Sequence, residues 1–369
     1  MQRILFLIKN YADNPEIFKE YLKLFNKSNF ETEVFDIAKA HSAGRGIKYV
    51  VSVLKAIIKF KPDFIYVADE FFSKNVLFAT FAKKILFQKC RIITFIATQY
   101  MPKNKNGFLN RAKLNFLLNN IDALFCRNKK ELKKLKETDL LKNYGNLYQI
   151  YLGVPERFFY KIDQPKETIC NFLEVLRKNY PKIKDKHVLG FLGRIVPEKG
   201  LDILLECLKK LPGEFVLIYG GRAGNSNYFD KIQNFIAKNN LGERAVYLGQ
   251  IKGPDLKYVY NICDLMVMPT TQKHNNFSEL FGSVIPESML SKTLIAGSDN
   301  GSIPEVIGRK DMIFKQDDSE DLLRIINYCH DLSPEEKEKI LNENYSFAAK
   351  EYSAETFVGS IIKHISDEK

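Results

Sequence analysis

Residues 188–219 read VLGFLGRIVPEKGLDILLECLKKLPGEFVLIY, and this stretch shows most clearly how the chain folds. An apolar run, Val188–Leu192, leads through a glycine-bounded loop into a helix that ends at Pro212-Gly213. A second apolar run, Phe215–Tyr219, follows. The helix carries one buried stripe, formed by Leu201, Leu204, Leu208 and Leu211. Strand, helix and strand in succession predict parallel strands joined by a helical crossover.

The same alternation extends over the rest of the chain. In the first half, the runs that could be strands are Ile4–Ile8, Phe64–Val67, Ile92–Ile96, Ala123–Cys126 and Tyr148–Leu152. In the second half, the further runs are Ala245–Gly249, Leu265–Pro269 and Thr293–Gly297. Helical spacing occurs between these runs, as in Ile47–Phe60, where the expected buried stripe is Val50, Val51, Leu54, Ile57 and Ile58. The pattern predicts an α/β protein with two doubly wound parallel sheets.

The length of 369 residues exceeds what one hydrophobic core usually serves, so we expect two domains. Prolines and charges between Gly153 and Lys186 indicate the junction. We place the first domain at residues 1–165 and the second at residues 166–346, and we expect a helix at residues 347–369 to pack back on the first domain.

Hydropathy and cysteine spacing indicate a cytoplasmic protein. The opening apolar run reaches only to Lys9, whereas crossing a bilayer takes roughly 18 apolar residues. It therefore predicts a buried strand and no signal peptide. The six cysteines lie far apart and form no C-x-x-C pair, which favours reduced core thiols over disulfides or a zinc site.

Charge is shared unevenly along the chain. Residues 1–186 hold 35 Lys/Arg against 18 Asp/Glu, whereas residues 187–369 hold 21 against 26. Lysines interleaved with apolar residues concentrate in Phe81–Arg91, Arg111–Lys113 and Arg127–Lys142. One interpretation is peripheral contact with an anionic membrane surface, on the inner face of the cytoplasmic membrane. The other is a solvated lysine-rich face. No nucleic-acid recognition module is present, so we expect no nucleic-acid partner.

Two loop segments carry residues suited to binding a diphosphate and hydroxyl groups. Residues 193–200, GRIVPEKG, place Arg194 and Lys199 in a loop that opens onto a helix N-terminus, where anions are favoured. An ordinary turn with solvated charges is the alternative. Residues 279–287, ELFGSVIPE, place Glu279 and Glu287 around the start of a further helix, with Pro286 in its first turn. Together they suit a ligand with hydroxyls on both sides of a diphosphate.

With these motifs in order, the sequence resembles glycosyltransferase family 4, a group of retaining glycosyltransferases with the GT-B fold. Two further segments carry the resemblance, LGQIKGPDLKYVYNICDLMVMPT at residues 248–270 and NGSIPEVIG at residues 300–308. The resemblance implies two Rossmann-like doubly wound domains that face a cleft. It also implies transfer of a hexosyl unit, with a UDP-sugar favoured, from a nucleotide-sugar donor to a lipid-linked or cell-surface glycan acceptor.

The resemblance also implies roles for individual residues. Arg194 and Lys199 would neutralise the diphosphate in place of a metal ion, so no metal and no other cofactor is expected. Glu279 would bind the donor sugar and Glu287 the ribose. These residues make Glu279, Arg194 and Lys199 the candidate catalytic set. The remaining expected donor-binding residues are Gly193, Gly221, Arg222, Phe281, Gly282 and Ser283. On the acceptor side we expect Asn10, Tyr11 and Gln99.

Two departures from the family pattern leave alternatives open. The loop after the first strand lacks the Gly-Gly pair of many members and reads KNYADNP at residues 9–15. The segment at residues 97–100, ATQY, lacks a histidine that many members have. A non-catalytic sugar-nucleotide-binding subunit is therefore one alternative, and a soluble transferase acting on a protein or small molecule is another.

Overall fold

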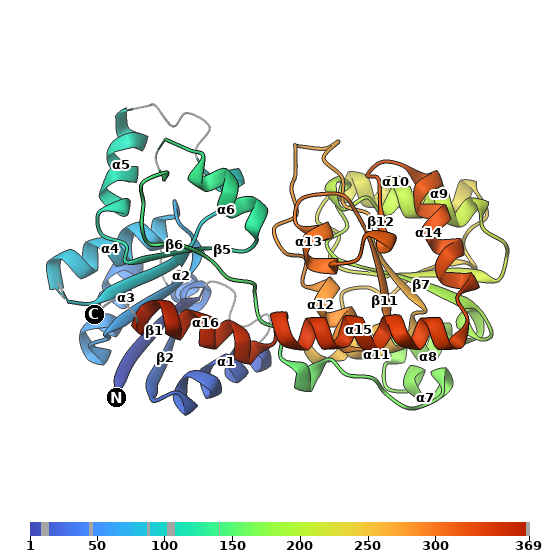
Figure 1. The fold of residues 1–369 in the computed structure, drawn as a ribbon, viewed down its shortest axis with the longest axis horizontal. Coiled ribbons are helices and arrows are strands. Elements are labelled where there is room, and N and C mark those ends of the chain that lie inside the picture. The colour runs from blue at the N-terminus through green and yellow to red at the C-terminus, as the bar shows by residue number, and fades with distance from the viewer. Residues whose placement is uncertain (9–14, 44–46, 87–88, 102–107, 140, 367–369) are drawn as a thin grey trace. The chain divides into compact units, whose positions relative to one another are not determined.

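The structure is a computed structural model that describes residues 1–8, 15–43, 47–86, 89–101, 108–139 and 141–366. The chain divides into two compact units (Figure 1). The first unit combines Met1–Gly153 with Ala354–Lys369, and the second is Val154–Ser353. Among the described residues, no helix has the length and apolar character needed to cross a membrane.

The first unit is built on six parallel strands in the order β2-β1-β3-β4-β5-β6. Their bounds are β1 Gln2–Ile8, β2 Phe30–Asp36, β3 Phe64–Glu70, β4 Arg91–Phe95, β5 Ala123–Cys126 and β6 Leu147–Gln149. Each neighbouring pair is parallel. The predicted doubly wound sheet is confirmed, and β2 is a strand that the apolar runs had not indicated.

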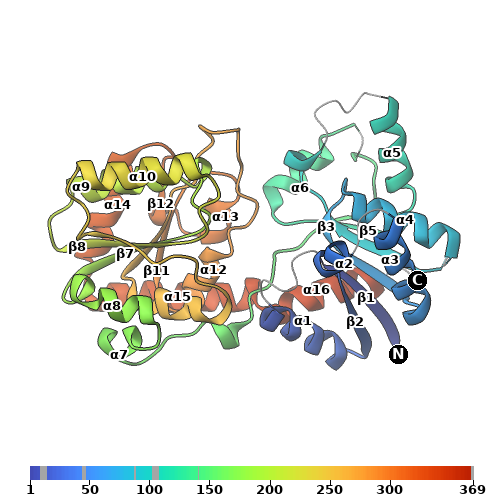
Figure 2. The same cartoon turned by 180° about the vertical axis from the view of Figure 1, so that it is seen from behind.

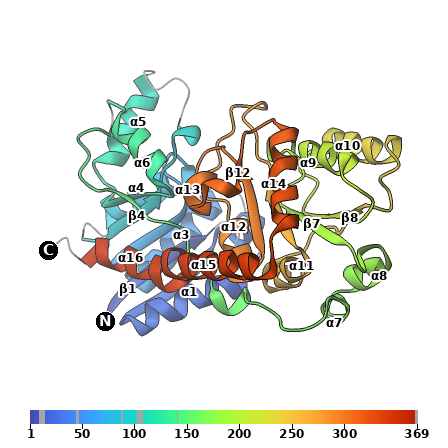
Figure 3. The same cartoon turned by 45° about the vertical axis from the view of Figure 1, so that its right-hand side comes forward.

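Helices cover both faces of this sheet. One face is covered by α1 (Pro15–Lys27) and α16 (Ala354–Ser366), which lie side by side (Figure 3). Phe25 of α1 and Phe357 of α16 belong to the apolar cluster on this face. The opposite face is covered by α3 (Ile47–Phe60), α4 (Lys74–Leu86), α5 (Phe108–Leu118) and α6 (Lys129–Lys136). A short helix, α2 (Ile37–Ala43), follows β2. The two apolar faces of the sheet are thereby removed from water.

Helix α3 has the predicted bounds, but its buried stripe differs from the expectation. Val53 and Ile57 are buried against the sheet, whereas Val51 and Ile58 are exposed. Because apolar residues occupy most of this helix, periodicity alone does not select the face that meets the sheet.

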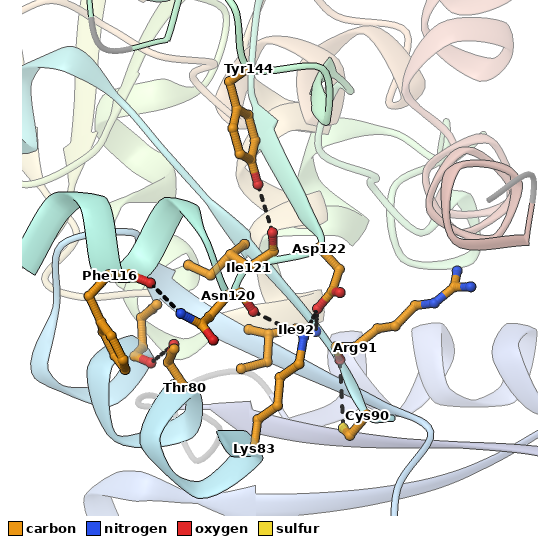
Figure 4. A network of polar contacts seen from close by, with 11 residues as sticks. Thr80, Lys83, Cys90, Arg91, Ile92, Phe116, Asn120, Ile121, Asp122 and Tyr144 are labelled. Carbon is orange, nitrogen blue, oxygen red and sulfur yellow. Dashed lines mark hydrogen bonds and ion pairs between the residues drawn. The ribbon is translucent and has the colours of Figure 1, made fainter. Parts of the chain in front are cut away.

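A polar network fixes helix α4 to the amino-terminal edge of the sheet (Figure 4). The Asp122 carboxylate accepts hydrogen bonds from the Lys83 ammonium group and from the backbone N–H of Ile92 at 2.6 Å. Lys83 also donates to the carbonyl of Asn120 at 3.0 Å. The Tyr144 hydroxyl donates to the Ile121 carbonyl at 2.7 Å. Lys83 is therefore a structural lysine and does not belong to a solvated basic face.

The second unit has six parallel strands in the order β12-β11-β10-β7-β8-β9. Their bounds are β7 His187–Leu192, β8 Phe215–Gly220, β9 Ala245–Tyr247, β10 Leu265–Met268, β11 Leu294–Ser298 and β12 Ile313–Phe314. From β7 the strand order runs one way through β8 to β9, and from β10 it runs the other way through β11 to β12. The topological switch point is therefore the pair β7 and β10.

Helices again lie on both sides of the sheet (Figure 2). On one side are α9 (Leu201–Lys210), α10 (Ser226–Lys238) and α14 (Ser319–Asp331). On the other are α8 (Glu174–Ile183), α11 (Leu256–Ile262) and α15 (Pro334–Tyr352). The remaining helices are α7 (Lys166–Cys170), α12 (Val284–Leu290) and α13 (Ile303–Ile307). This sandwich confirms the second predicted doubly wound sheet.

The division between the units lies at residues 153/154 and 353/354, whereas we expected 165/166 and 346/347. The backbone N–H of Val154 donates to the carbonyl of Tyr352 at 2.7 Å, so the chain joins the second unit immediately after Gly153. Tyr352 is buried and still belongs to α15, and the chain returns to the first sheet only with α16.

All six cysteines are buried thiols, as the sequence indicated. Burial raises the pKa of the thiols of Cys90, Cys207 and Cys329 to about 12. These thiols therefore remain protonated at neutral pH and behave as apolar core groups.

Candidate functional site

The predicted site residues of the second unit gather at the topological switch point of its sheet. Residues 193–200 follow the carboxyl end of β7, and residues 269–283 follow the carboxyl end of β10, its neighbour. In open α/β sheets, ligands bind outside the carboxyl ends of the strands at such a point. The fold thus brings together two motifs that lie about 80 residues apart in the sequence.

Two glycines allow the first loop to fit between its neighbours. A Cβ on Gly200, which has a φ of 68°, would lie 1.9 Å from the carbonyl oxygen of Pro269. A Cβ on Gly221 would lie 1.7 Å from the carbonyl oxygen of Gly193. The loop is also bonded on both sides, from Thr271 N–H to the Glu198 carbonyl at 3.0 Å and from Ile195 N–H to the Arg222 carbonyl at 2.9 Å. Its backbone is therefore held in place before any ligand arrives.

Lys199 and Glu279 form an ion pair at this edge of the sheet. The ammonium group of Lys199 donates to the Glu279 carboxylate, and the two side chains are only 16% and 11% exposed. The ammonium nitrogen also lies 5.2 Å from the centre of the Phe277 ring. An ammonium group, which could neutralise a diphosphate, and a carboxylate, which could accept from hydroxyls, are thus adjacent.

Arg194 is much more accessible than Lys199. Its side chain is 51% exposed, and its guanidinium lies 3.5 Å from the carboxylate of Glu198, which is itself largely buried. An exposed guanidinium with a long contact to one carboxylate keeps donors available for a phosphate. Of the two cations Arg194 and Lys199, Arg194 is therefore the one that an anion could reach with less rearrangement of side chains.

The loop that carries Glu279 is fixed by Asn300. The side chain of Asn300 is fully buried and accepts the backbone N–H of Glu279 at 2.8 Å. The same amide donates to the Phe277 carbonyl at 3.1 Å. A Cβ on Gly301 would lie 2.2 Å from the Glu279 carbonyl oxygen. The residues that follow β11 therefore set the position of Glu279.

Phe281, Gly282 and Ser283 lead into helix α12. Phe281 is buried, and its ring meets that of Tyr352 edge to face at 5.5 Å. Gly282 has a φ of 70°, a conformation that favours glycine. Ser283 is exposed and immediately precedes the helix, which has Pro286 in its first turn as expected. These residues place the start of α12 next to Glu279 in the chain.

Glu287 is buried on α12, where the sequence placed it near the helix start. Its carboxylate accepts the hydroxyl hydrogen of Tyr260, a side chain with no exposed surface, and also bonds to the side chain of Ser283. Burial raises the pKa of the Glu287 carboxyl above its usual range, although both hydrogen bonds act in the opposite direction. Burial, and then the Glu287 charge, raise the pKa of Tyr260 far above its usual value.

Gly193, Gly221 and Arg222 lie at the carboxyl ends of β7 and β8. Gly193 N–H donates to the Gly220 carbonyl at 3.0 Å, so the two loops begin side by side. The Arg222 side chain is exposed. The structure thus brings all ten predicted donor-side residues into loops at one edge of the second sheet or into the helix that follows.

The acceptor-side residues are placed only in part. Gln99 is exposed in a short turn of helix, Thr98–Tyr100, that follows β4. Asn10 and Tyr11 lie outside the described residues. The role of all three in acceptor binding stays a prediction.

Sequence reasoning missed two residues of the site, Tyr260 and Asn300. Both lie inside motifs that the sequence made visible, residues 248–270 and 300–308. No sequence pattern sets either side chain apart from the polar residues beside it. Their partners, Glu287 and Glu279, lie 27 and 21 residues away in the chain, a relation that local patterns do not show.

Comparison with known proteins shows what the second unit resembles. Residues 174–346 match the family described as "Glycosyl transferases group 1". This match covers most of the second unit, Val154–Ser353, and does not extend into the first. This match and the named relatives confirm the predicted resemblance to glycosyltransferases.

Two relatives illustrate the similarity and its extent. An uncharacterized glycosyltransferase of Methanocaldococcus jannaschii is 28% identical over 266 residues, which cover 70% of this chain and 63% of that protein. A lipopolysaccharide core biosynthesis mannosyltransferase of Rhizobium leguminosarum is 29% identical over 38% of this chain and 40% of its own length. The alignments thus span less than two thirds of either relative.

The fold is shared over the full length with solved structures. An Anabaena protein, HepE, crystallised with UDP and glucose, superposes with a TM-score of 0.74 at 18% identity, covering 99% of this chain and all of that one. A glycosyltransferase of Rickettsia africae superposes with a TM-score of 0.77 at 16% identity, covering 99% and 98%. The predicted GT-B class of two α/β domains is confirmed.

Proposed function

We propose that this chain transfers a hexosyl unit, with retention, from a nucleoside diphosphate sugar to a glycan acceptor. The observation that carries the proposal is the meeting of Lys199 and Glu279 at the switch point, with Arg194 accessible on the same loop. A diphosphate needs cations, and a sugar needs a carboxylate acceptor for its hydroxyls. Both are present at the place where the fold binds ligands.

The chemistry of the site follows from its charges. When the bond between the sugar and the diphosphate breaks, negative charge grows on the leaving group. Lys199 moves from Glu279 toward the phosphate when the donor binds, before this bond breaks, and the move frees Glu279 to accept from the sugar. Arg194 and Lys199 then stabilise the charge on the leaving group, which lowers the barrier without metal participation. Metal independence is part of the proposal.

A UDP-sugar is the favoured donor. The Anabaena protein of similar fold was crystallised with UDP, with UDP and glucose, and with UDP-glucose. Glu287 would accept from the ribose hydroxyls, and the loops after β7 and β8, with Gly193, Gly221 and Arg222, would line the nucleotide. Backbone N–H groups of residues 281–283 would reach the donor sugar or phosphate.

The proposed acceptor is a lipid-linked or cell-surface glycan, with the protein at the inner face of the cytoplasmic membrane. The Rhizobium leguminosarum relative acts in lipopolysaccharide core synthesis, which supports this choice. Helix α4 ends with exposed apolar residues, Ile85 and Leu86, beside exposed Lys84, and Leu109 on α5 is 80% exposed. Apolar side chains flanked by lysines suit an anionic lipid surface.

Membrane contact is tested by flotation with liposomes. We expect the protein to float with vesicles that contain phosphatidylglycerol and not with phosphatidylcholine vesicles at 0.15 M salt. Replacing Ile85 and Leu109 by serine should abolish flotation, whereas replacing Val51 and Ile58, exposed on α3, should not. Binding to neither vesicle would favour a soluble transferase that acts on a protein or small molecule.

Thermal stabilisation by UDP, GDP and ADP, each with and without EDTA, tests the donor site. We expect one nucleotide to raise the melting temperature by several degrees, with no effect of EDTA, and Arg194→Ala to lose most of this shift. No shift with any nucleotide would contradict the donor site. A shift without sugar transfer would favour a non-catalytic sugar-nucleotide-binding subunit.

A further inference from the structure

We propose that Tyr260 is a positioning residue that sets the selectivity of the donor site for ribose, by orienting the Glu287 carboxylate. The inference rests on the proposed function, because it concerns the same nucleotide. It assigns a role to a tyrosine that has no exposed surface and cannot itself touch a ligand without a change in the fold.

The geometry makes Glu287 the partner of the Tyr260 hydroxyl. The hydroxyl donates to one carboxylate oxygen of Glu287, while the Tyr260 ring packs edge to face against Phe159 at 6.0 Å. The carbonyl of Tyr260 accepts the hydroxyl of Thr293 at 2.8 Å. Tyr260 is thus fixed by its ring and by its backbone, and its hydroxyl holds the carboxylate in one orientation.

Burying the Tyr260 hydroxyl and the Glu287 carboxylate together lowers the stability of the fold, so a functional reason for keeping both is expected. A buried carboxylate loses hydration, and a buried hydroxyl needs a partner. Phenylalanine at 260 and an apolar residue at 287 would pack without either cost. Retaining both polar groups is explained if the carboxylate must stay ionised and correctly oriented for a ligand.

The occupied sites on the carboxylate indicate what the ligand must offer. An ionised carboxylate accepts about four hydrogen bonds, and Tyr260 and Ser283 supply two. The free positions suit two neighbouring hydroxyls, which a ribose presents at its 2′ and 3′ carbons. A 2′-deoxyribose would leave one buried acceptor position unmatched, so the site should discriminate between the two sugars.

The test compares ribonucleotide with 2′-deoxyribonucleotide binding in Tyr260→Phe. The probes are UDP, GDP and ADP and their 2′-deoxy forms, each with the dissociation constant measured by calorimetry. Ribose is common to all three, so the test does not depend on the base. We expect wild-type protein to prefer the ribonucleotide by about ten-fold or more, the ratio that one matched hydrogen bond supplies. In Tyr260→Phe the ratio should fall toward one.

Tyr352→Phe is the matched control. Tyr352 is also a fully buried tyrosine of the second unit, but its hydroxyl donates to the Val306 carbonyl at 3.1 Å. Its replacement should leave the ratio of the two dissociation constants unchanged, even if it lowers the melting temperature as much as Tyr260→Phe does.

The outcomes separate the inference from the function beneath it. Wild-type selectivity that persists in Tyr260→Phe would overturn the role of Tyr260 and leave the donor site intact. Equal loss of selectivity in both tyrosine variants would show a general structural effect and would also overturn the role. If wild-type protein binds no nucleotide, the proposed function itself fails, and the inference fails with it.

Discussion

The ion pair between Lys199 and Glu279 gives a prediction whose size follows from the structure. Lys199→Ala leaves the Glu279 carboxylate, in a side chain only 11% exposed, without its cation. Breaking a fully buried pair costs about 3–5 kcal/mol, and the partial exposure here reduces the expected loss to about 2 kcal/mol. For a unit of this size, that lowers the melting temperature by about 4–8 °C.

A double-mutant cycle separates this stability effect from ligand binding. Glu279→Gln removes the charge, so Lys199→Ala/Glu279→Gln should be more stable than Lys199→Ala alone by at least about 1 kcal/mol. Neither Lys199→Ala nor the double variant should be stabilised by nucleotide as the wild type is. Differential scanning fluorimetry and urea denaturation measure both effects. The reasoning would be refuted if Lys199→Ala kept the wild-type melting temperature and the wild-type nucleotide shift.

The remaining predictions concern Arg194, Glu287, Gly200 and Asn300. Arg194→Ala should change the free energy of unfolding by less than about 1 kcal/mol, since its contact with Glu198 is long and half exposed, yet it should lose most nucleotide stabilisation in calorimetry. Because burial raises the Glu287 pKa, the ionised acceptor is lost as pH falls through that raised value. Nucleotide affinity should therefore drop on acidification above pH 4.5, and Glu287→Gln should abolish that dependence in titrations across pH. The same raised pKa makes the contribution of Glu287 to folding smaller as pH rises through it, which pH-dependent urea denaturation of wild type and Glu287→Gln checks. Gly200→Ala should lower stability by more than about 2 kcal/mol, because its Cβ would collide with the Pro269 carbonyl. Asn300→Ala should lower both stability and sugar transfer, whereas Asn300→Asp, which keeps the acceptor oxygen, should retain more of each; equal loss in both would contradict the role of that oxygen.

The sequence predicted most strands because buried parallel strands are continuous apolar runs. Strand β2 reads FETEVFD and carries three carboxylates, so its pattern is not that of a strand buried on both faces. It lies at the edge of the sheet, where charges are tolerated. Strand β12 has only two residues, too few for any periodicity to appear.

The candidate site was predictable as a set of motifs and not as a set of contacts. Arg194, Lys199, Glu279 and Glu287 stand out because cations and carboxylates flank glycines and a helix start. Their pairing with one another depends on the strand order, which brings β7 beside β10. Asn300 and Tyr260 act through tertiary hydrogen bonds and leave no local signature.

The basic first half shows why charge counts alone do not predict a surface. Lys83 donates to the Asp122 carboxylate, and Lys113 donates to the Phe72 carbonyl at 2.8 Å. Arg127 forms an ion pair with Glu70 at 2.9 Å. These three cations are tied to the fold. Only the tertiary structure separates them from the exposed lysines on α4 and α6.

The most direct test of the central claim measures the release of UDP from UDP-hexoses in the presence of EDTA. The anomeric configuration of the sugar product is determined by NMR. We predict UDP release by the wild type, near-complete loss in Arg194→Ala, and a product that keeps the configuration of the donor. Nucleotide binding without release from any nucleoside diphosphate sugar, or a product of inverted configuration, would contradict the account.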